Sequence, residues 1–119
     1  MAKVPFSKFG AKINTEVCEY TFINSKGEEI KYEIIKYLPF VDKLTVISDI
    51  INQSIDDKGY YNPMRVKIYT VLEIVYNYTN LSFTDKMKED PFKLYDTIMS
   101  TDIFNNILEA IGDSEWKEI

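Results

Sequence analysis

The stretch that decides the fold is residues 62–79, NPMRVKIYTVLEIVYNYT. Pro63 suits the first turn of a helix and Asn62 suits the N-cap, so a helix is predicted over about 63–79. Its predicted core positions are Met64, Ile68, Val71, Leu72 and Val75, and further apolar residues cover most of its other sides. The polar strip is narrow and consists of Lys67, Thr70, Glu73 and Asn77. A helix with so narrow a polar face is expected to be central and packed on several sides.

A second amphipathic helix is predicted just before the central one, with Pro39 in its first turn. Apolar residues recur along it at helical spacing, and its predicted core stripe is Phe40, Leu44, Ile47, Ile51 and Ile55. Gly59 follows in a polar turn and is predicted to stop this helix in the left-handed conformation.

Residues 17–37 are predicted to form an antiparallel β-hairpin, because apolar and polar residues alternate in two short runs. The turn between the runs contains Gly27, which can supply a positive φ. The half-buried face of the hairpin is expected to consist of Cys18, Tyr20, Phe22, Ile30, Tyr32 and Ile34.

The rest of the chain shows three more helix boundaries. Thr84 is predicted to cap a short turn, and Asp90-Pro91 to open a helix that buries Phe92, Leu94, Tyr95, Ile98 and Met99. A last helix is predicted to stop at Gly112. The chain is therefore expected to be one α+β domain of 119 residues. Its predicted parts are an arm at 1–12, a β-hairpin at 17–37 and a bundle of four to five helices at 39–119.

The sequence lacks recognisable catalytic equipment. It has no histidine, which removes the commonest general base and the commonest zinc ligand. Cys18 is the only cysteine and lies on a predicted strand, where a buried, inert thiol is expected. The acidic turn at Asp56-Asp57 does not have the spacing of a calcium-binding loop. We therefore expect no enzyme, no catalytic residue, no metal site and no cofactor.

Charge and hydropathy narrow the classes of partner. A net charge of −5 disfavours direct binding to the phosphates of nucleic acid. No apolar stretch approaches the ~20 residues of a membrane span, and the N-terminus lacks the layout of a secretory signal. The partner is therefore expected to be a protein, which includes the alternative of a homo-oligomer.

Six aromatic residues are candidates for contact with that protein, namely Phe6, Phe9, Tyr60, Tyr61, Phe83 and Trp116. The first two lie in the arm, which is expected to dock on its own domain or on a partner. The arm carries basic residues and no acid, whereas residues 109–119 carry four acids against Lys117 alone. Tyr60-Tyr61 lies between the two main helices, either as an exposed tip of the kind enriched at interfaces or folded back onto the hairpin. The same alternatives apply to Phe83 and Trp116.

Three segments together resemble small proteins encoded by tailed bacteriophages of low-GC Gram-positive bacteria. They are KYLPF at 36–40, YTNLSFTDK at 78–86 and KLYD at 93–96. The resemblance extends over about residues 28–98, and it implies a role in virion morphogenesis. As physical features these segments are helix entries and core positions, so they mark a fold and not an active site.

Two functions of different classes fit these observations. The first is a non-enzymatic virion structural or assembly component, of the tail-assembly chaperone, connector or decoration type, located in the host cytoplasm and in the virion. The second is a small acidic anti-defence or host-takeover inhibitor that binds a host nucleic-acid-processing enzyme. Such an inhibitor should gather most of the 19 acids on one face. Because lysines and acids alternate closely along the chain, the first function is favoured, with a phage structural protein rather than a host protein as the partner.

Overall fold

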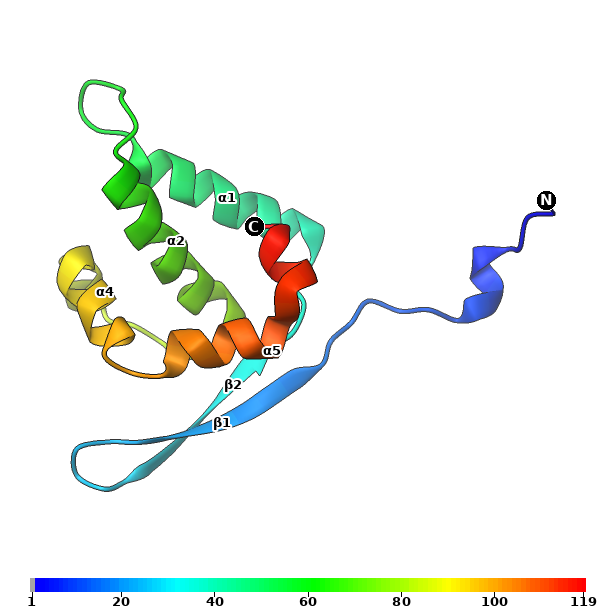
Figure 1. The fold of residues 1–119 in the computed structure, drawn as a ribbon, viewed down its shortest axis with the longest axis horizontal. Coiled ribbons are helices and arrows are strands. Elements are labelled where there is room, and N and C mark those ends of the chain that lie inside the picture. The colour runs from blue at the N-terminus through cyan, green and yellow to red at the C-terminus, as the bar shows by residue number, and fades with distance from the viewer. Residues whose placement is uncertain (1) are drawn as a thin grey trace.

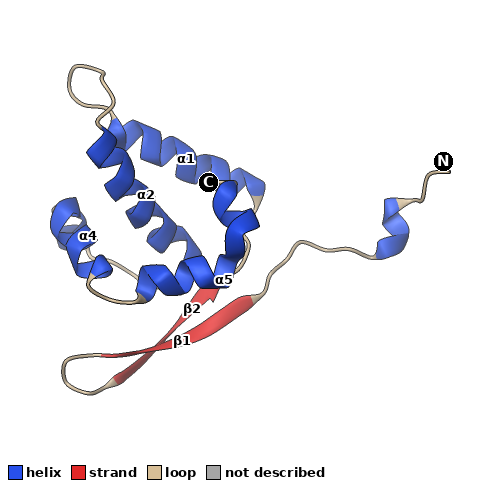
Figure 2. Ribbon diagram, viewed as in Figure 1, coloured by secondary structure: helices blue, strands red, loops and turns tan. Residues whose placement is uncertain are grey.

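The computed structural model describes residues 2–119, and it consists of a β-hairpin followed by helices (Figure 1). Along the chain the elements are η1 (Phe6–Phe9), β1 (Val17–Ile23), β2 (Glu29–Ile35), α1 (Phe40–Ser54), α2 (Pro63–Tyr78), α3 (Asp85–Lys88), α4 (Pro91–Met99) and α5 (Ile103–Lys117). Figure 2 shows the α-helices gathered together beside the β-hairpin, with η1 apart from them on the N-terminal arm. The predicted α+β fold is confirmed.

Helix α2 is the centre of the domain, as its sequence predicts, and it packs against α1, α4 and α5. The side chain of Asn62 caps it by accepting a hydrogen bond from the backbone N–H of Met64 at 3.0 Å. Two expectations for α2 are wrong. Met64 is exposed, because it lies in the first turn, outside the core. Glu73 is buried instead of lying on a polar strip, and its carboxylate accepts a hydrogen bond from Gln53 Nε2 at 2.9 Å.

The hairpin pairs β1 with β2 in antiparallel register, with Tyr20 opposite Tyr32 and their ring centroids 5.9 Å apart. Tyr32 and Ile34 are buried, and α5 packs against β2. Asn106 on α5 donates a hydrogen bond to the hydroxyl of Tyr32 at 3.0 Å. Contrary to expectation Ile30 is exposed, because it lies near the turn, at the end of the hairpin away from the buried positions.

Helix α1 forms where the sequence predicts it but buries a different face. The buried residues are Lys43, Val46, Ile50 and Ser54. The predicted core stripe is wrong, since Phe40 is 64% exposed and Leu44 47% exposed, with Ile51 exposed as well and Ile47 and Ile55 half-buried. The physical reason is that α1 has two adjacent stripes with apolar residues. The stripe that faces α2 contains two polar side chains whose hydrogen bonds are satisfied inside the domain.

Two further sequence expectations need correction. Helix α1 ends at Ser54, before Gly59, and Gly59 with φ of 83° closes a turn in which its N–H bonds the carbonyl of Asp56 at 3.0 Å. In α4 only Leu94 and Ile98 are fully buried, whereas Phe92 and Met99 are exposed. Helix α4 lies at the margin of the bundle, so just one side of it meets the core (Figure 1).

Gly112 produces a sharp bend inside α5, as predicted for a helix stop. Its φ of 77° and ψ of 173° are not helical and are accessible almost solely to glycine. Helical geometry resumes after it and continues to Lys117. The bend redirects residues 113–117 toward α1, where Glu115 becomes buried.

Candidate protein-binding surfaces

The N-terminal arm extends away from the domain (Figure 1). It is longer than predicted, because no helix or strand other than η1 precedes Val17 among the residues the structure describes. At its root the carbonyl of Glu16 accepts a hydrogen bond from Lys36 N at 3.1 Å, and the two side chains form an ion pair at 3.3 Å. The arm is therefore fixed at Glu16 and does not dock on its own domain.

The tip of the arm presents two aromatic rings together. Phe6 and Phe9 lie in the 3₁₀ turn η1, and their ring centroids are 5.6 Å apart in a stacked arrangement. They are 72% and 66% exposed, respectively. Gly10 then ends the turn in the left-handed conformation. Exposed paired aromatic rings are unusual for a surface in contact with water alone, so this tip is a strong candidate for a partner contact.

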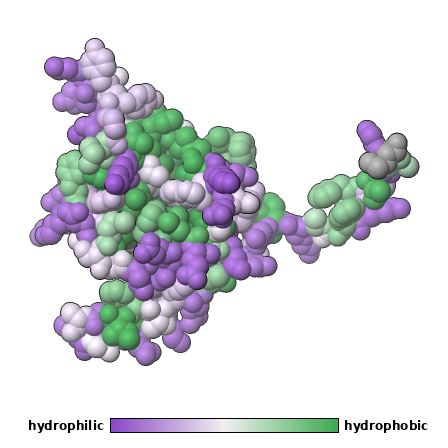
Figure 3. Space-filling view, in the orientation of Figure 1, coloured by the Kyte–Doolittle hydropathy of each residue, from purple (hydrophilic) through white to green (hydrophobic). Residues whose placement is uncertain are grey.

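The exposed apolar side of α1 is a second candidate surface, which the sequence did not predict. This surface, termed the α1 face, consists of the exposed Phe40, Leu44 and Ile51 and the half-buried Ile47. Figure 3 shows hydrophobic residues over the front of the helical bundle, including the region of α1, and a smaller group on the arm. Neighbouring exposed apolar side chains on one helix mark an interaction site more often than scattered ones do.

The Tyr60-Tyr61 loop projects from the domain between α1 and α2 (Figure 1). Both rings are exposed, so they do not fold back onto the hairpin. The loop is nevertheless well ordered by hydrogen bonds, since the carboxylate of Asp56 accepts bonds from the backbone N–H of Lys58 and of Tyr60, each at 2.9 Å. It is thus a small, separate projection that remains a candidate contact.

Phe83 and Trp116 are engaged within the domain. The ring of Phe83 is half-buried and meets the ring of Tyr76 edge-on, with centroids 5.2 Å apart. Trp116 is partly exposed, and it meets the ring of Phe104 edge-on at 6.2 Å. Of the six predicted aromatic residues, Phe6, Phe9, Tyr60 and Tyr61 are therefore the most available to a partner.

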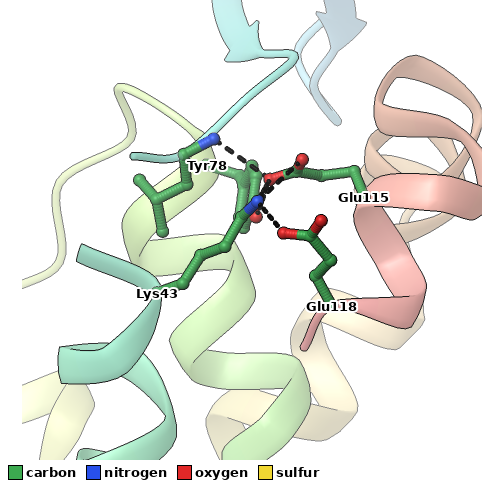
Figure 4. A network of polar contacts seen from close by, with 5 residues as sticks. Lys43, Tyr78, Glu115 and Glu118 are labelled. Carbon is green, nitrogen blue, oxygen red and sulfur yellow. Dashed lines mark hydrogen bonds and ion pairs between the residues drawn. The ribbon is translucent and has the colours of Figure 1, made fainter. Parts of the chain in front are cut away.

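A buried polar network joins three segments that are distant in sequence (Figure 4). The Glu115 carboxylate accepts hydrogen bonds from the hydroxyl of Tyr78 at 2.6 Å, from the N–H of Leu38 at 3.1 Å and from Lys43 Nζ at 3.1 Å. Lys43 Nζ also donates to the carboxylate of Glu118 at 2.7 Å. The sequence did not predict this network, because its hydrogen-bonded partners lie 37 to 77 residues apart along the chain.

Burial and hydrogen bonding change the pKa values of Lys43 and Tyr78 in this network. Burial alone would lower the pKa of Lys43, but the hydrogen bonds to Glu118 and Glu115 outweigh it and raise the pKa above the usual 10.5. Burial raises the pKa of Tyr78 far above the usual 10.0, and its hydrogen bond to Glu115 raises this pKa further. Near neutral pH Lys43 is therefore an ammonium group and Tyr78 a neutral phenol.

The raised pKa values predict a loss of stability in alkali. A group whose pKa is higher in the folded protein contributes stability that is present below the unfolded pKa and is lost as pH rises through the folded one. For Tyr78 this loss begins near pH 10 and amounts to at most about 1.4 kcal/mol per pH unit. Urea unfolding measured from pH 8 to 11.5 should show a shallower alkaline decline for Tyr78→Phe than for the wild type. Parallel profiles of the two proteins would contradict this assignment.

One groove is the remaining feature of possible chemical interest in the described residues. An open groove of about 560 Å³ lies beside α3 and α4, and its lining mixes acids and lysines such as Asp90 and Lys93 with Met87 and Leu94. Within residues 2–119, no three Cys, Asp or Glu side chains are grouped so that they could hold a metal ion. No helix in the same range has both the length and the apolar character needed to cross a membrane.

Comparison of the chain with protein-family models, with curated proteins and with solved structures finds no match. Functional inference therefore depends on the surfaces described above.

Proposed function

We propose that this chain is a non-enzymatic structural or assembly component of a bacteriophage virion, of the connector, decoration or tail-assembly chaperone type. In this proposal it attaches to a neighbouring protein through its N-terminal arm. The observation that carries the proposal is the geometry of the arm, which is anchored at Glu16 and presents the stacked rings of Phe6 and Phe9 away from the domain.

Three properties of the arm suit attachment. Its exposed apolar side chains supply contact area that is not used within its own domain. Lys3, Lys8 and Lys12 add positive charge without any acid in residues 2–15, which favours an acidic partner surface. An extended segment also spans a long distance with few residues, so a short arm can reach from one protein domain to another.

The remainder of the support comes from the sequence. Histidine is absent, and the three quoted segments resemble phage proteins. Lysines and acids alternate along the domain, and Lys31, Lys36 and Lys43 form ion pairs with acids, the first of them with Glu19 at 3.7 Å. This mixing of charges supports a structural component in preference to an acidic inhibitor.

The proposal predicts that the protein is present in purified virions, or in assembly intermediates, of a phage that encodes it. Mass spectrometry of such particles should detect the wild-type chain, and the double variant Phe6→Ser/Phe9→Ser should be depleted at least about tenfold, because interface aromatic residues carry much of the binding energy. Met64→Gln/Met87→Gln removes exposed apolar side chains outside the arm and serves as the control, with no depletion expected. Absence of the wild-type chain from virions and from every assembly intermediate would overturn the proposal.

A further inference from the structure

We infer that the arm of one copy of this chain docks on the α1 face of a second copy, in a reciprocal exchange that forms a dimer. The inference rests on the proposed function, because it assigns an occupant to the same arm. It follows from two apolar surfaces that are both left open by the isolated domain, and from the charges around them.

The first observation is that each surface lacks a cover within its own chain. Phe6 and Phe9 on the arm are exposed, as are Val4 and Ile13 on either side of them. The α1 face is exposed at Phe40, Leu44 and Ile51, although its residues have the spacing of a core stripe. Mutual docking removes both sets of side chains from water at once.

The second observation is the distribution of charge: the arm is basic, the rest of the chain is acidic, and α1 is the helix without an exposed lysine. The single basic residue of α1, Lys43, is buried in the ion-pair network. Its two acids, Asp42 and Asp49, lie on the side of the helix away from the α1 face, so the face itself carries no charge. Each of the other helices in the described part of the chain has at least one exposed lysine, namely Lys67, Lys86, Lys88, Lys93 or Lys117. A basic arm with no acid therefore meets no exposed positive charge on α1, unlike on α2, α3, α4 or α5.

The third observation is the match in spacing. Side chains three or four residues apart on a helix have Cβ atoms about 5–6 Å apart. The centroids of the Phe6 and Phe9 rings are separated by 5.6 Å. The two rings can therefore occupy neighbouring gaps along the row formed by Phe40, Leu44, Ile47 and Ile51.

The direction of the arm favours a second copy over its own domain. The hydrogen bond and the ion pair between Glu16 and Lys36 fix its root, and from there the arm leads outward (Figure 1). Since every copy has both an arm and an α1 face, a two-fold axis forms two identical contacts. Reciprocal exchange of this kind is a low-cost route to a dimer.

The test is complementation between two double variants of the full chain. The arm variant is Phe6→Ser/Phe9→Ser, and the face variant is Leu44→Gln/Ile51→Gln, which changes exposed positions and should leave the fold intact by circular dichroism. Light scattering and sedimentation velocity over a range of concentrations should show a dimer for the wild type. Each variant alone should dissociate at least about tenfold more readily, since both of its contacts are damaged.

An equimolar mixture of the two variants should regain dimers, because one arm and one α1 face remain intact in each mixed pair. Met64→Gln/Met87→Gln is again the control and should dimerise as the wild type does. A wild type that stays monomeric at the highest attainable concentration would overturn the inference, and so would a mixture that regains no dimer.

Failure of this inference is distinguishable from failure of the proposed function. A monomeric wild type whose incorporation into virions still depends on Phe6 and Phe9 would show that the arm docks on another protein. A dimer that passes the complementation test but is absent from virions and assembly intermediates would leave the exchange standing and overturn the virion role.

Discussion

Replacing Glu115 by Gln is expected to lower the free energy of unfolding by about 3 to 5 kcal/mol, which is the usual effect of removing one partner of a buried ion pair. The ammonium group of Lys43 is 2% exposed, and in the variant it would face a neutral amide instead of the carboxylate of Glu115. Glu118 alone could not compensate, because its side chain is 58% exposed and shares its charge with solvent. Urea unfolding at pH 7 measures the effect.

Two comparisons make the result specific to the buried pair. Glu118→Gln removes the exposed partner of the same lysine and should cost less than about 1 kcal/mol. Lys43→Met combined with Glu115→Gln should recover most of the lost stability, because the amide oxygen can still accept from the N–H of Leu38 and the hydroxyl of Tyr78 while no charge stays buried. Equal losses for Glu115→Gln and Glu118→Gln would show that burial is not the deciding factor.

Ile50→Ala is expected to lower the free energy of unfolding by about 2 to 4 kcal/mol, whereas Ile51→Ala should lower it by less than about 1 kcal/mol. The two residues are chain neighbours of the same type on α1, but Ile50 is 8% exposed and Ile51 is 39% exposed. Removing methylene groups leaves a cavity only where neighbours surround the side chain. The pair therefore tests which stripe of α1 faces the core.

These measurements are best made at low protein concentration, where exchange between copies does not contribute to stability. The opposite order of the two effects would mean that Phe40, Leu44, Ile47 and Ile51 form the buried stripe, as the sequence pattern suggested.

Local signals made much of the fold predictable. Strict alternation around Tyr20 and Tyr32 predicted the hairpin, and Asn62-Pro63 predicted the start of α2, because each signal acts within a few residues of the structure that it specifies. The bend at Gly112 was predictable for the same reason.

The part of the fold that could not be predicted depends on contacts between residues distant in sequence. The buried stripe of α1 contains Lys43 and Ser54, which look like surface residues until their partners are known. The partners of Lys43 lie more than 70 residues away in α5 and its C-cap, and no spacing rule links them. Only the more regular apolar stripe was visible in the sequence, and it is the exposed one.

The candidate surfaces also divide into those that local sequence signals predicted and one that depends on tertiary packing. Aromatic type and position in the predicted arm and loop indicated that Phe6, Phe9, Tyr60 and Tyr61 could meet a partner, and the structure places all four in solvent. The α1 face was missed, because an amphipathic stripe is ordinarily taken as core. A possible signal was the presence of apolar residues on two sides of one helix.

The distance along the chain between the partners of the buried network has a consequence for synthesis. Contacts between residues 38–43 and 115–118 join segments more than 70 residues apart, so we expect them to form late in folding. Until Glu115 has been added, the ammonium group of Lys43 cannot be buried without an uncompensated charge. A nascent or truncated chain that lacks Glu115 should therefore remain incompletely folded and susceptible to proteases. The carboxylate of Glu115 would then distinguish full-length chains from incomplete ones.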